Sequence, residues 1–285
     1  MLEVVDLKKS FGGREILHGL NLTFESGVYG LLGPNGAGKS TLMNIITGLL
    51  RQTSGQVLFH GVPASDRRSG FAAKLGYLPQ QPGYYKNYTA AEFLRYLSAL
   101  KGIRGKNEAQ IAHLLEFVNL SENADQKLGT FSGGMLRRAG LAQALLGNPE
   151  VVILDEPTAG LDPLERIRLR NLLAEIAKGR TVIVATHIVP DVEFIANQVI
   201  LMFDGQVRQM GKPEELAEAV RGQVWQVWTD YAGAERLSKR FATGNLFTEQ
   251  DACVLRIVSE TQPTPEAVPV QPTLEDAFLR ESARR

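Results

Sequence analysis

Short hydrophobic runs rich in β-branched residues recur along the chain, and segments with helical spacing lie between several of them. Runs that are apolar nearly throughout are typical of strands covered on both faces, as in a parallel sheet of an α/β domain. Near the start, apolar positions alternate with polar ones, which indicates an antiparallel portion. The runs span residues 27–32, 57–59, 151–154, 181–185 and 199–203, and the alternating positions are Leu2, Val4, Leu7, Leu20, Leu22 and Phe24. We therefore predict an α/β fold with a mixed sheet and an antiparallel N-terminal portion.

The middle of the chain has a different pattern. From Thr89 to about Phe117, apolar residues recur at helical spacing. Thr89 followed by Glu92 is a capping-box pattern that predicts the start of a helix. We expect a helical lobe at about residues 88–135, inserted into the α/β core.

The character of the sequence changes again after about Arg221. We predict a small α+β extension over residues 221–285, appended to a main domain of residues 1–220. Its expected elements are a strand at 224–228, a helix at 234–241, a strand at 254–258, an extended proline-rich linker at 261–272 and a final helix that opens with a capping box at 273–276.

Composition narrows the class of protein. A chain of 285 residues suits one large α/β domain with an appendage. Lys+Arg and Asp+Glu are both 31, so the balance of charge gives no reason to expect nucleic acid as a partner. The single cysteine, Cys253, fits a reduced, cytosolic setting. We find neither a signal sequence nor an apolar run of the roughly 20 residues that a membrane span needs, so we expect any membrane role to depend on a separate partner.

A phosphate-binding motif follows the first apolar run. Residues 33–40 fit G-x-x-x-x-G-K-[ST] in full, between a predicted strand and a helical segment at 41–50. The glycines let the backbone N–H groups face phosphate oxygens, Lys39 would reach the β- and γ-phosphates, and Ser40 would hold Mg²⁺. The predicted ATP-binding residues here are Gly33, Pro34, Asn35, Gly36, Ala37, Gly38, Lys39, Ser40 and Thr41. The motif predicts a P-loop NTPase core.

Two carboxylates follow the run 151–154. Asp155 at the end of such a strand can hold Mg²⁺, directly or through water. Glu156 is then placed to polarise a water beside the γ-phosphate. Strands often end at a charged residue, so these two carboxylates would not indicate an ATP-hydrolysis site by themselves. Together with the phosphate motif, they do indicate one.

Over residues 2–220 the sequence resembles the ATP-binding domains of ABC transporters. The most specific match is the segment 131–135, FSGGM, which is similar to the family signature LSGGQ. The resemblance implies that Ser132, Gly133 and Gly134 contact the γ-phosphate bound to the opposite subunit. Met135 stands where the family usually has Gln and would lose a polar contact.

The resemblance assigns four further positions. Phe11 matches the aromatic residue that stacks on adenine, and Gln80 matches the glutamine that senses Mg²⁺ and the attacking water, with Gln81 as the alternative. Asp162 matches a loop that crosses the dimer interface, and His187 matches the histidine that contacts the γ-phosphate. The implied cofactors are ATP and Mg²⁺, and the implied catalytic set is Glu156, His187 and Gln80.

The resemblance also implies partners. Each chain carries one phosphate motif and one signature, so two chains, identical or different, would close head-to-tail around two ATP molecules. A separate transmembrane permease would dock near residues 82–89 and keep the protein at the cytoplasmic face of the membrane. The ending at 272–279 resembles subunits that pair with export-type permeases.

Three other functions compete with that of an ATP-binding subunit of an ABC transporter. A soluble ABC ATPase of translation usually carries two ATP domains, and one of DNA repair carries a long coiled coil, for which residues 80–132 leave no room. A GTP switch protein should show an N-K-x-D motif, which we do not find. A non-hydrolysing regulatory subunit is disfavoured because Glu156 and His187 fill both catalytic positions.

Overall fold

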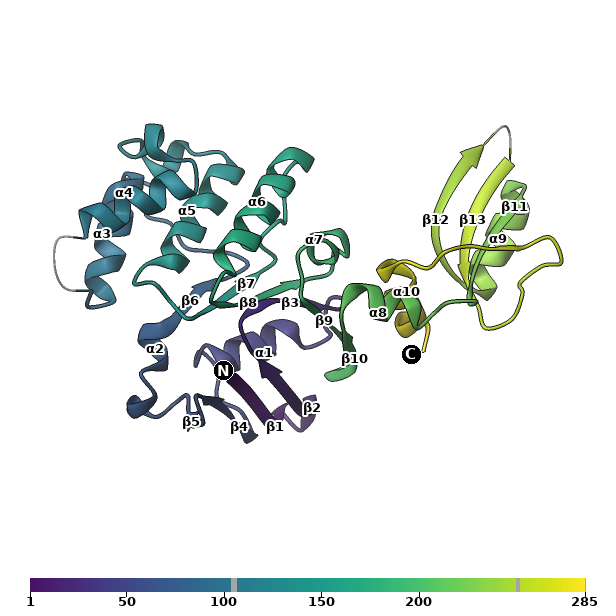
Figure 1. Cartoon of the computed structure of the whole chain (residues 1–285), viewed down its shortest axis with the longest axis horizontal. Coiled ribbons are helices and arrows are strands. Elements are labelled where there is room, and N and C mark those ends of the chain that lie inside the picture. Colours follow the sequence, from purple (N-terminus) through teal and green to yellow (C-terminus); the bar gives the residue numbers. More distant parts are fainter. Residues whose placement is uncertain (104–106, 250–251, 285) are drawn as a thin grey trace.

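The computed structural model describes residues 1–103, 107–249 and 252–284. Within these ranges the strands form three sheets, of which the C-terminal one stands apart from the other two (Figure 1). None of the helices in the described part of the chain is long and apolar enough to cross a membrane.

The central sheet is mixed, as predicted. Its strand order is β10-β9-β3-β8-β7-β6, with β10 as an antiparallel edge on otherwise parallel strands. The strands are β3 (Gly27–Leu32), β6 (Leu75–Leu78), β7 (Val151–Asp155), β8 (Thr181–Thr186), β9 (Gln198–Phe203) and β10 (Gln206–Gly211). Every residue of β7 and β8 is buried, because helices or the second sheet cover both faces.

The second sheet is the predicted antiparallel portion. Its order is β2-β1-β4-β5, built from β1 (Leu2–Phe11), β2 (Arg14–Phe24), β4 (Ser54–Phe59) and β5 (Val62–Pro63). The alternating apolar residues of the sequence are cross-strand partners, with Leu2 opposite Phe24, Val4 opposite Leu22 and Leu7 opposite Leu20. The expected parallel strand at 57–59 is wrong: β4 pairs antiparallel with β1, and a three-residue run is too short to reveal this.

Helices surround the central sheet and form a lobe at one end of it (Figure 1). Their bounds are α1 (Lys39–Ile46), α2 (Phe71–Lys74), α3 (Ala90–Leu100), α4 (Glu108–Phe117), α5 (Gly133–Leu145), α6 (Pro163–Ile176), α7 (Pro190–Glu193) and α8 (Pro213–Glu218). The capping box of Thr89 and Glu92 is confirmed at the start of α3. The expected helical stretch 89–117 contains two helices, because α3 ends at Leu100, before Gly102 with its positive φ of 68°.

The C-terminal extension has an antiparallel sheet in the order β12-β13-β11-β14. Its elements are β11 (Val224–Thr229), α9 (Tyr231–Arg240), β12 (Ala242–Glu249), β13 (Ala252–Val258), β14 (Val268–Pro269) and α10 (Leu274–Ala283). The sequence did not predict β12. It also did not predict β14, whose residues fall within the expected linker but pair with β11.

The last helix, α10, joins the extension to the main domain (Figure 1). It contacts α8 and β9 on one side and β12 and β13 on the other. The ring of Phe278 packs 5.3 Å from that of Phe203 in β9, measured between centroids. The buried carboxylate of Asp276 receives two hydrogen bonds, of 2.8 and 2.6 Å, from Arg256 in β13. The sheet of the extension is therefore held to the main domain mainly through α10.

Candidate functional site

The loop of residues 33–40 connects β3 to α1, in the strand-loop-helix arrangement that the motif requires. Gly38 precedes the first helical residue with a φ of 100°, a conformation that glycine adopts without penalty. A Cβ atom added at Gly33 would lie 2.2 Å from the backbone oxygen of Met202. Glycine is therefore required at both positions for the loop to follow this path.

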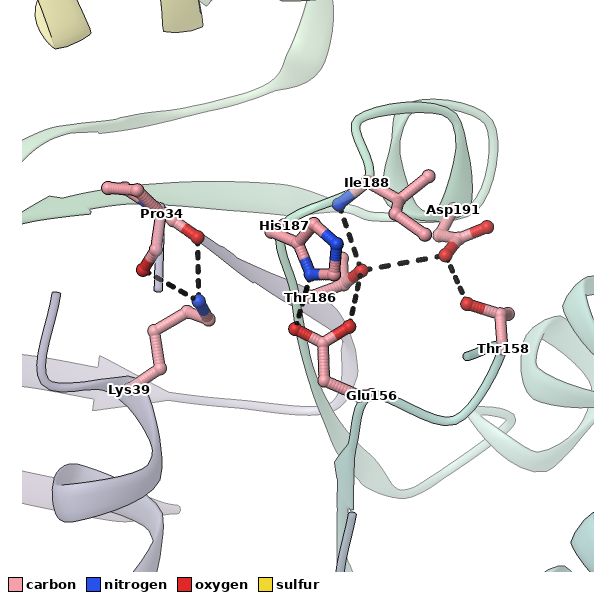
Figure 2. Close-up of polar contacts among 9 residues, drawn as sticks. Pro34, Lys39, Glu156, Thr158, Thr186, His187, Ile188 and Asp191 are labelled. Atoms are coloured by element: carbon pink, nitrogen blue, oxygen red, sulfur yellow. Dashed lines mark hydrogen bonds and ion pairs between the residues drawn. The ribbon is translucent and has the colours of Figure 1, made fainter. Parts of the chain in front are cut away.

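Lys39 is the first residue of α1 and is buried. Its Nζ donates hydrogen bonds of 2.6 and 3.1 Å to the backbone oxygens of Gly33 and Pro34 (Figure 2). Burial lowers the pKa of this ammonium group, and the nearby carboxylates of Glu156 and Asp155 oppose that shift. The loop thus holds a desolvated cation, which an anionic ligand would stabilise.

A cavity of about 420 Å³ opens over this loop. The predicted site residues that line it are Phe11, Asn35, Gly36, Ala37, Gly38, Lys39, Ser40, Thr41, Gln80, Asp155 and Glu156. Phe11 is 48% exposed at the end of β1, and the Lys9 ammonium lies over its ring, 4.6 Å from the centroid. Gln80, rather than its neighbour Gln81, is among the lining residues. The fold thus brings the phosphate motif, the acidic strand end and Gln80 into one cavity.

Arg14 and Ile16 also line the cavity, and the sequence analysis missed them. Both lie at the start of β2, directly after the turn that follows Phe11. Arg14 lies opposite Phe11 across the β1–β2 hairpin. The available signal was the Gly12-Gly13 pair between them, which is typical of a tight hairpin turn.

Asp155 ends β7 and is only 4% exposed. Burial raises the pKa of its carboxyl, while a hydrogen bond from Ser40 and the charge of Lys39 lower it. A hydroxyl and a carboxylate beside a phosphate loop are oxygen ligands of the kind that Mg²⁺ takes together with substrate phosphates and water. Among the described residues, no cluster of three or more His, Cys, Asp or Glu side chains could hold a metal ion. A Mg²⁺ ion bound through substrate phosphates and water needs only one or two protein carboxylates.

Glu156 has a positive φ of 47°, which is unusual for a residue other than glycine and is often found at functional sites. Its side chain is buried and points toward His187, which follows β8 (Figure 2). His187 Nδ1 lies 2.8 Å from Glu156 Oε1, and the imidazole is 46% exposed. The fold therefore joins these two predicted catalytic residues at the edge of the cavity.

The predicted signature residues lie outside this cavity. Ser132 caps α5 by accepting a hydrogen bond from the Met135 N–H at 3.2 Å, and Asp162 caps α6 by accepting one from the Glu165 N–H at 2.9 Å. Both caps are exposed. The cavity and the signature are thus separate surfaces of one chain.

Comparison with known proteins identifies the family. Residues 17–159 match the family described as ABC transporter. The chain is 36% identical to an uncharacterized ABC transporter ATP-binding protein, sll0415, of Synechocystis sp., over 95% of this chain and 79% of the relative. It is 37% identical to the Nod factor export ATP-binding protein I of Burkholderia lata, over 76% of this chain and 72% of that protein.

A similarity to a solved structure supports the same family. The chain is similar to the dimeric structure of MJ0796, a bacterial ABC transporter cassette, with 27% sequence identity and a TM-score of 0.68. The match covers 74% of this chain and 98% of the MJ0796 chain. With the family match and the two relatives, this shows that the chain is an ATP-binding protein of the ABC transporter family.

Proposed function

We propose that this chain binds and hydrolyses ATP, with Glu156 polarising the attacking water and His187 contacting the γ-phosphate. The observation that carries the proposal is the 2.8 Å contact between His187 Nδ1 and Glu156 Oε1 beside the phosphate loop. That contact fixes the carboxylate and the imidazole relative to each other. A general base positioned in this way contributes about 10²–10⁴-fold to the rate.

The loop of residues 33–41 would bind the phosphates of ATP through its backbone N–H groups and Lys39. Lys39 would exchange its bonds to the carbonyls of Gly33 and Pro34 for phosphate oxygens, which gives its buried charge an anionic partner. The exposed ring of Phe11 would stack on the adenine. In the bound state Ser40, Asp155 and Gln80 would hold Mg²⁺, which neutralises charge that develops on the phosphates.

We further propose that two such chains form a head-to-tail dimer. Ser132, Gly133 and Gly134 begin α5 with free N–H groups that suit an anion, yet they lie away from the cavity of their own chain. Asp162 is exposed at the start of α6, where it could cross to a partner. Each ATP would then be enclosed by the loop of one chain and the signature of the other, identical or different, and hydrolysis would reopen the dimer.

A separate transmembrane permease is the proposed partner, docked near residues 82–89. This segment is linked both to the cavity and to the signature helix. Tyr84 Oη, in this segment, donates to the backbone oxygen of Leu136 in α5 at 2.7 Å. Arg137, also in α5, donates to the backbone oxygen of the cavity residue Gln80 at 2.9 Å. A change at the γ-phosphate could therefore reach the permease through these bonds, at the cytoplasmic face of the membrane.

We propose export as the direction of transport. The proposal is supported by the relative named for Nod factor export and by the ending at residues 272–279. The cargo would contact the permease alone.

The test is to purify a tagged form of this chain from detergent-solubilised membranes of its own host and to identify what accompanies it by mass spectrometry. A multi-span membrane protein is the expected companion, and its sequence would give cargo and direction. Recovery of soluble or ribosomal proteins alone, with ATP hydrolysis intact, would favour a soluble ABC ATPase.

A further inference from the structure

A buried carboxylate with no role in the proposed mechanism lies next to the catalytic pair. Asp191 is on α7 and only 2% exposed. It lies four residues after His187 and does not line the cavity over the phosphate loop. A buried carboxylate is costly unless hydrogen bonds compensate it, so its partners indicate what it holds in place.

Two buried threonines contact Asp191 through the same oxygen, Oδ2 (Figure 2). Thr158, in the loop after β7, donates its hydroxyl in a short hydrogen bond. Thr186, at the end of β8, lies 3.5 Å away through Oγ1. Asp191 therefore joins two segments, the loop that carries Glu156 and the strand end that carries His187.

The Thr186 hydroxyl connects this cluster to Glu156. Its oxygen accepts a 3.0 Å hydrogen bond from the Ile188 N–H, and it lies 3.4 Å from Glu156 Oε2. A hydroxyl has one hydrogen to donate. Thr186 can therefore donate to Glu156 or to Asp191, but not to both at once.

The loop that Asp191 holds is short and continues toward the proposed dimer interface. Thr158 is two residues after Glu156 and four before Asp162. Its backbone oxygen accepts the Leu161 N–H at 3.1 Å, and the Arg170 guanidinium on α6 donates to the backbone oxygen of Pro190 at 2.8 Å. The segment from Glu156 to α6 is thus tied to α7 at two points, through Thr158 to Asp191 and through Arg170 to Pro190.

We propose that Asp191 is a positioning residue for ATP hydrolysis. By holding the Thr158 hydroxyl it fixes the loop that places Glu156 against His187. Through Thr186, whose hydroxyl lies 3.4 Å from Glu156 Oε2 and 3.5 Å from Asp191 Oδ2, it also supports the strand end beside Glu156. This inference rests on the proposed ATPase function and adds a residue to it that does not touch the substrate.

The test compares steady-state ATP hydrolysis by the full-length wild type, Asp191→Ala, Thr158→Val, Thr158→Ser and the double variant Asp191→Ala/Thr158→Val. We expect both Asp191→Ala and Thr158→Val to lower kcat by roughly 10- to 100-fold, since small misplacement of a reacting group can have effects of this size. The KM for ATP should stay near the wild-type value, because the phosphate loop is untouched. Thr158→Ser keeps the hydroxyl and should retain most of the activity.

The double variant should be no slower than the slower single variant, because both changes remove one shared interaction. Glu281→Ala is the matched control: it also removes a buried acid, but on α10, far along the chain from the phosphate loop. It should lower thermal stability without lowering kcat.

Three results would overturn the inference. They are a wild-type kcat in Asp191→Ala, an equal loss in Thr158→Ser and Thr158→Val, or an equal loss of kcat in Glu281→Ala. If Asp191→Ala does not fold, the comparison of Ser with Val at position 158 decides. If the wild type hydrolyses ATP and the variants match its rate, only the proposed role of Asp191 is refuted. No turnover by the wild type refutes the proposed function as well.

Discussion

Replacing Asp276 with alanine should loosen the sheet of the C-terminal extension from the main domain. Asp276 is 1% exposed and receives two hydrogen bonds from Arg256. The same carboxylate accepts the Thr273 N–H at 2.7 Å and the Thr273 hydroxyl at 2.8 Å at the start of α10. The substitution therefore removes both a partly buried ion pair and a helix cap.

The expected loss follows from the burial of the two partners. Removing one member of a buried pair costs about 3–5 kcal/mol, because the other charge is left without compensation. Arg256 keeps 27% of its side chain exposed, so water compensates it in part and the lower end, about 3 kcal/mol, applies. Loss of the hydrogen bonds from Thr273 adds about 1 kcal/mol. At a urea dependence of about 1–3 kcal/mol/M, the unfolding midpoint of the extension should fall by at least about 1 M.

Tryptophan fluorescence during urea unfolding would measure this change selectively. The two tryptophans of the chain, Trp225 and Trp228, both lie in β11 of the extension. Glu235→Ala is the control, since it breaks an exposed ion pair with Lys239 on α9 and should leave the midpoint almost unchanged. A loss below about 1 kcal/mol in Asp276→Ala would show that the Arg256 pair does not hold the sheet to α10.

Three further predictions concern the main domain. Lys39→Ala should abolish ATP turnover, measured as phosphate release, and unchanged turnover would refute the role of the phosphate loop. Gly33→Ala should lower both thermal stability and ATP binding, because its Cβ would lie 2.2 Å from the backbone oxygen of Met202; wild-type values for both would contradict this. Tyr84→Phe removes a hydrogen bond to the Leu136 backbone oxygen and should cost about 1 kcal/mol at neutral pH. Burial raises the Tyr84 pKa from 10.0 to about 12, so the wild type should lose stability relative to this variant as pH rises from 10 to 12. A pH-independent difference in urea unfolding over that range would show that burial does not raise the pKa of Tyr84.

Much of the fold could be predicted because its signals are local. The alternation at Leu2, Val4 and Leu7 was enough to predict a strand with one buried face, and the phosphate motif predicted both its own loop and the elements on either side. The capping boxes that start α3 and α10 each lie within four residues and are confirmed.

The rest depends on contacts between distant parts of the chain. β12 contains Gly244 and Asn245 and has no clear alternation, so its pairing with β13 stabilises it as a strand. β14 is a strand only because it pairs with β11, about 40 residues earlier. The same holds for the site, where Thr158 and Asp191 are 33 residues apart in sequence and meet only in the folded protein.

The mass of the Glu156→Gln variant in solution, measured by light scattering after size exclusion with ATP and Mg²⁺, tests whether ATP closes two chains into a head-to-tail dimer. This variant should bind ATP but fail to hydrolyse it, so the head-to-tail dimer should persist. We expect twice the 31.3 kDa of one chain with ATP and the monomer mass without it. A monomer that carries bound ATP would contradict the proposed roles of Glu156 and Ser132.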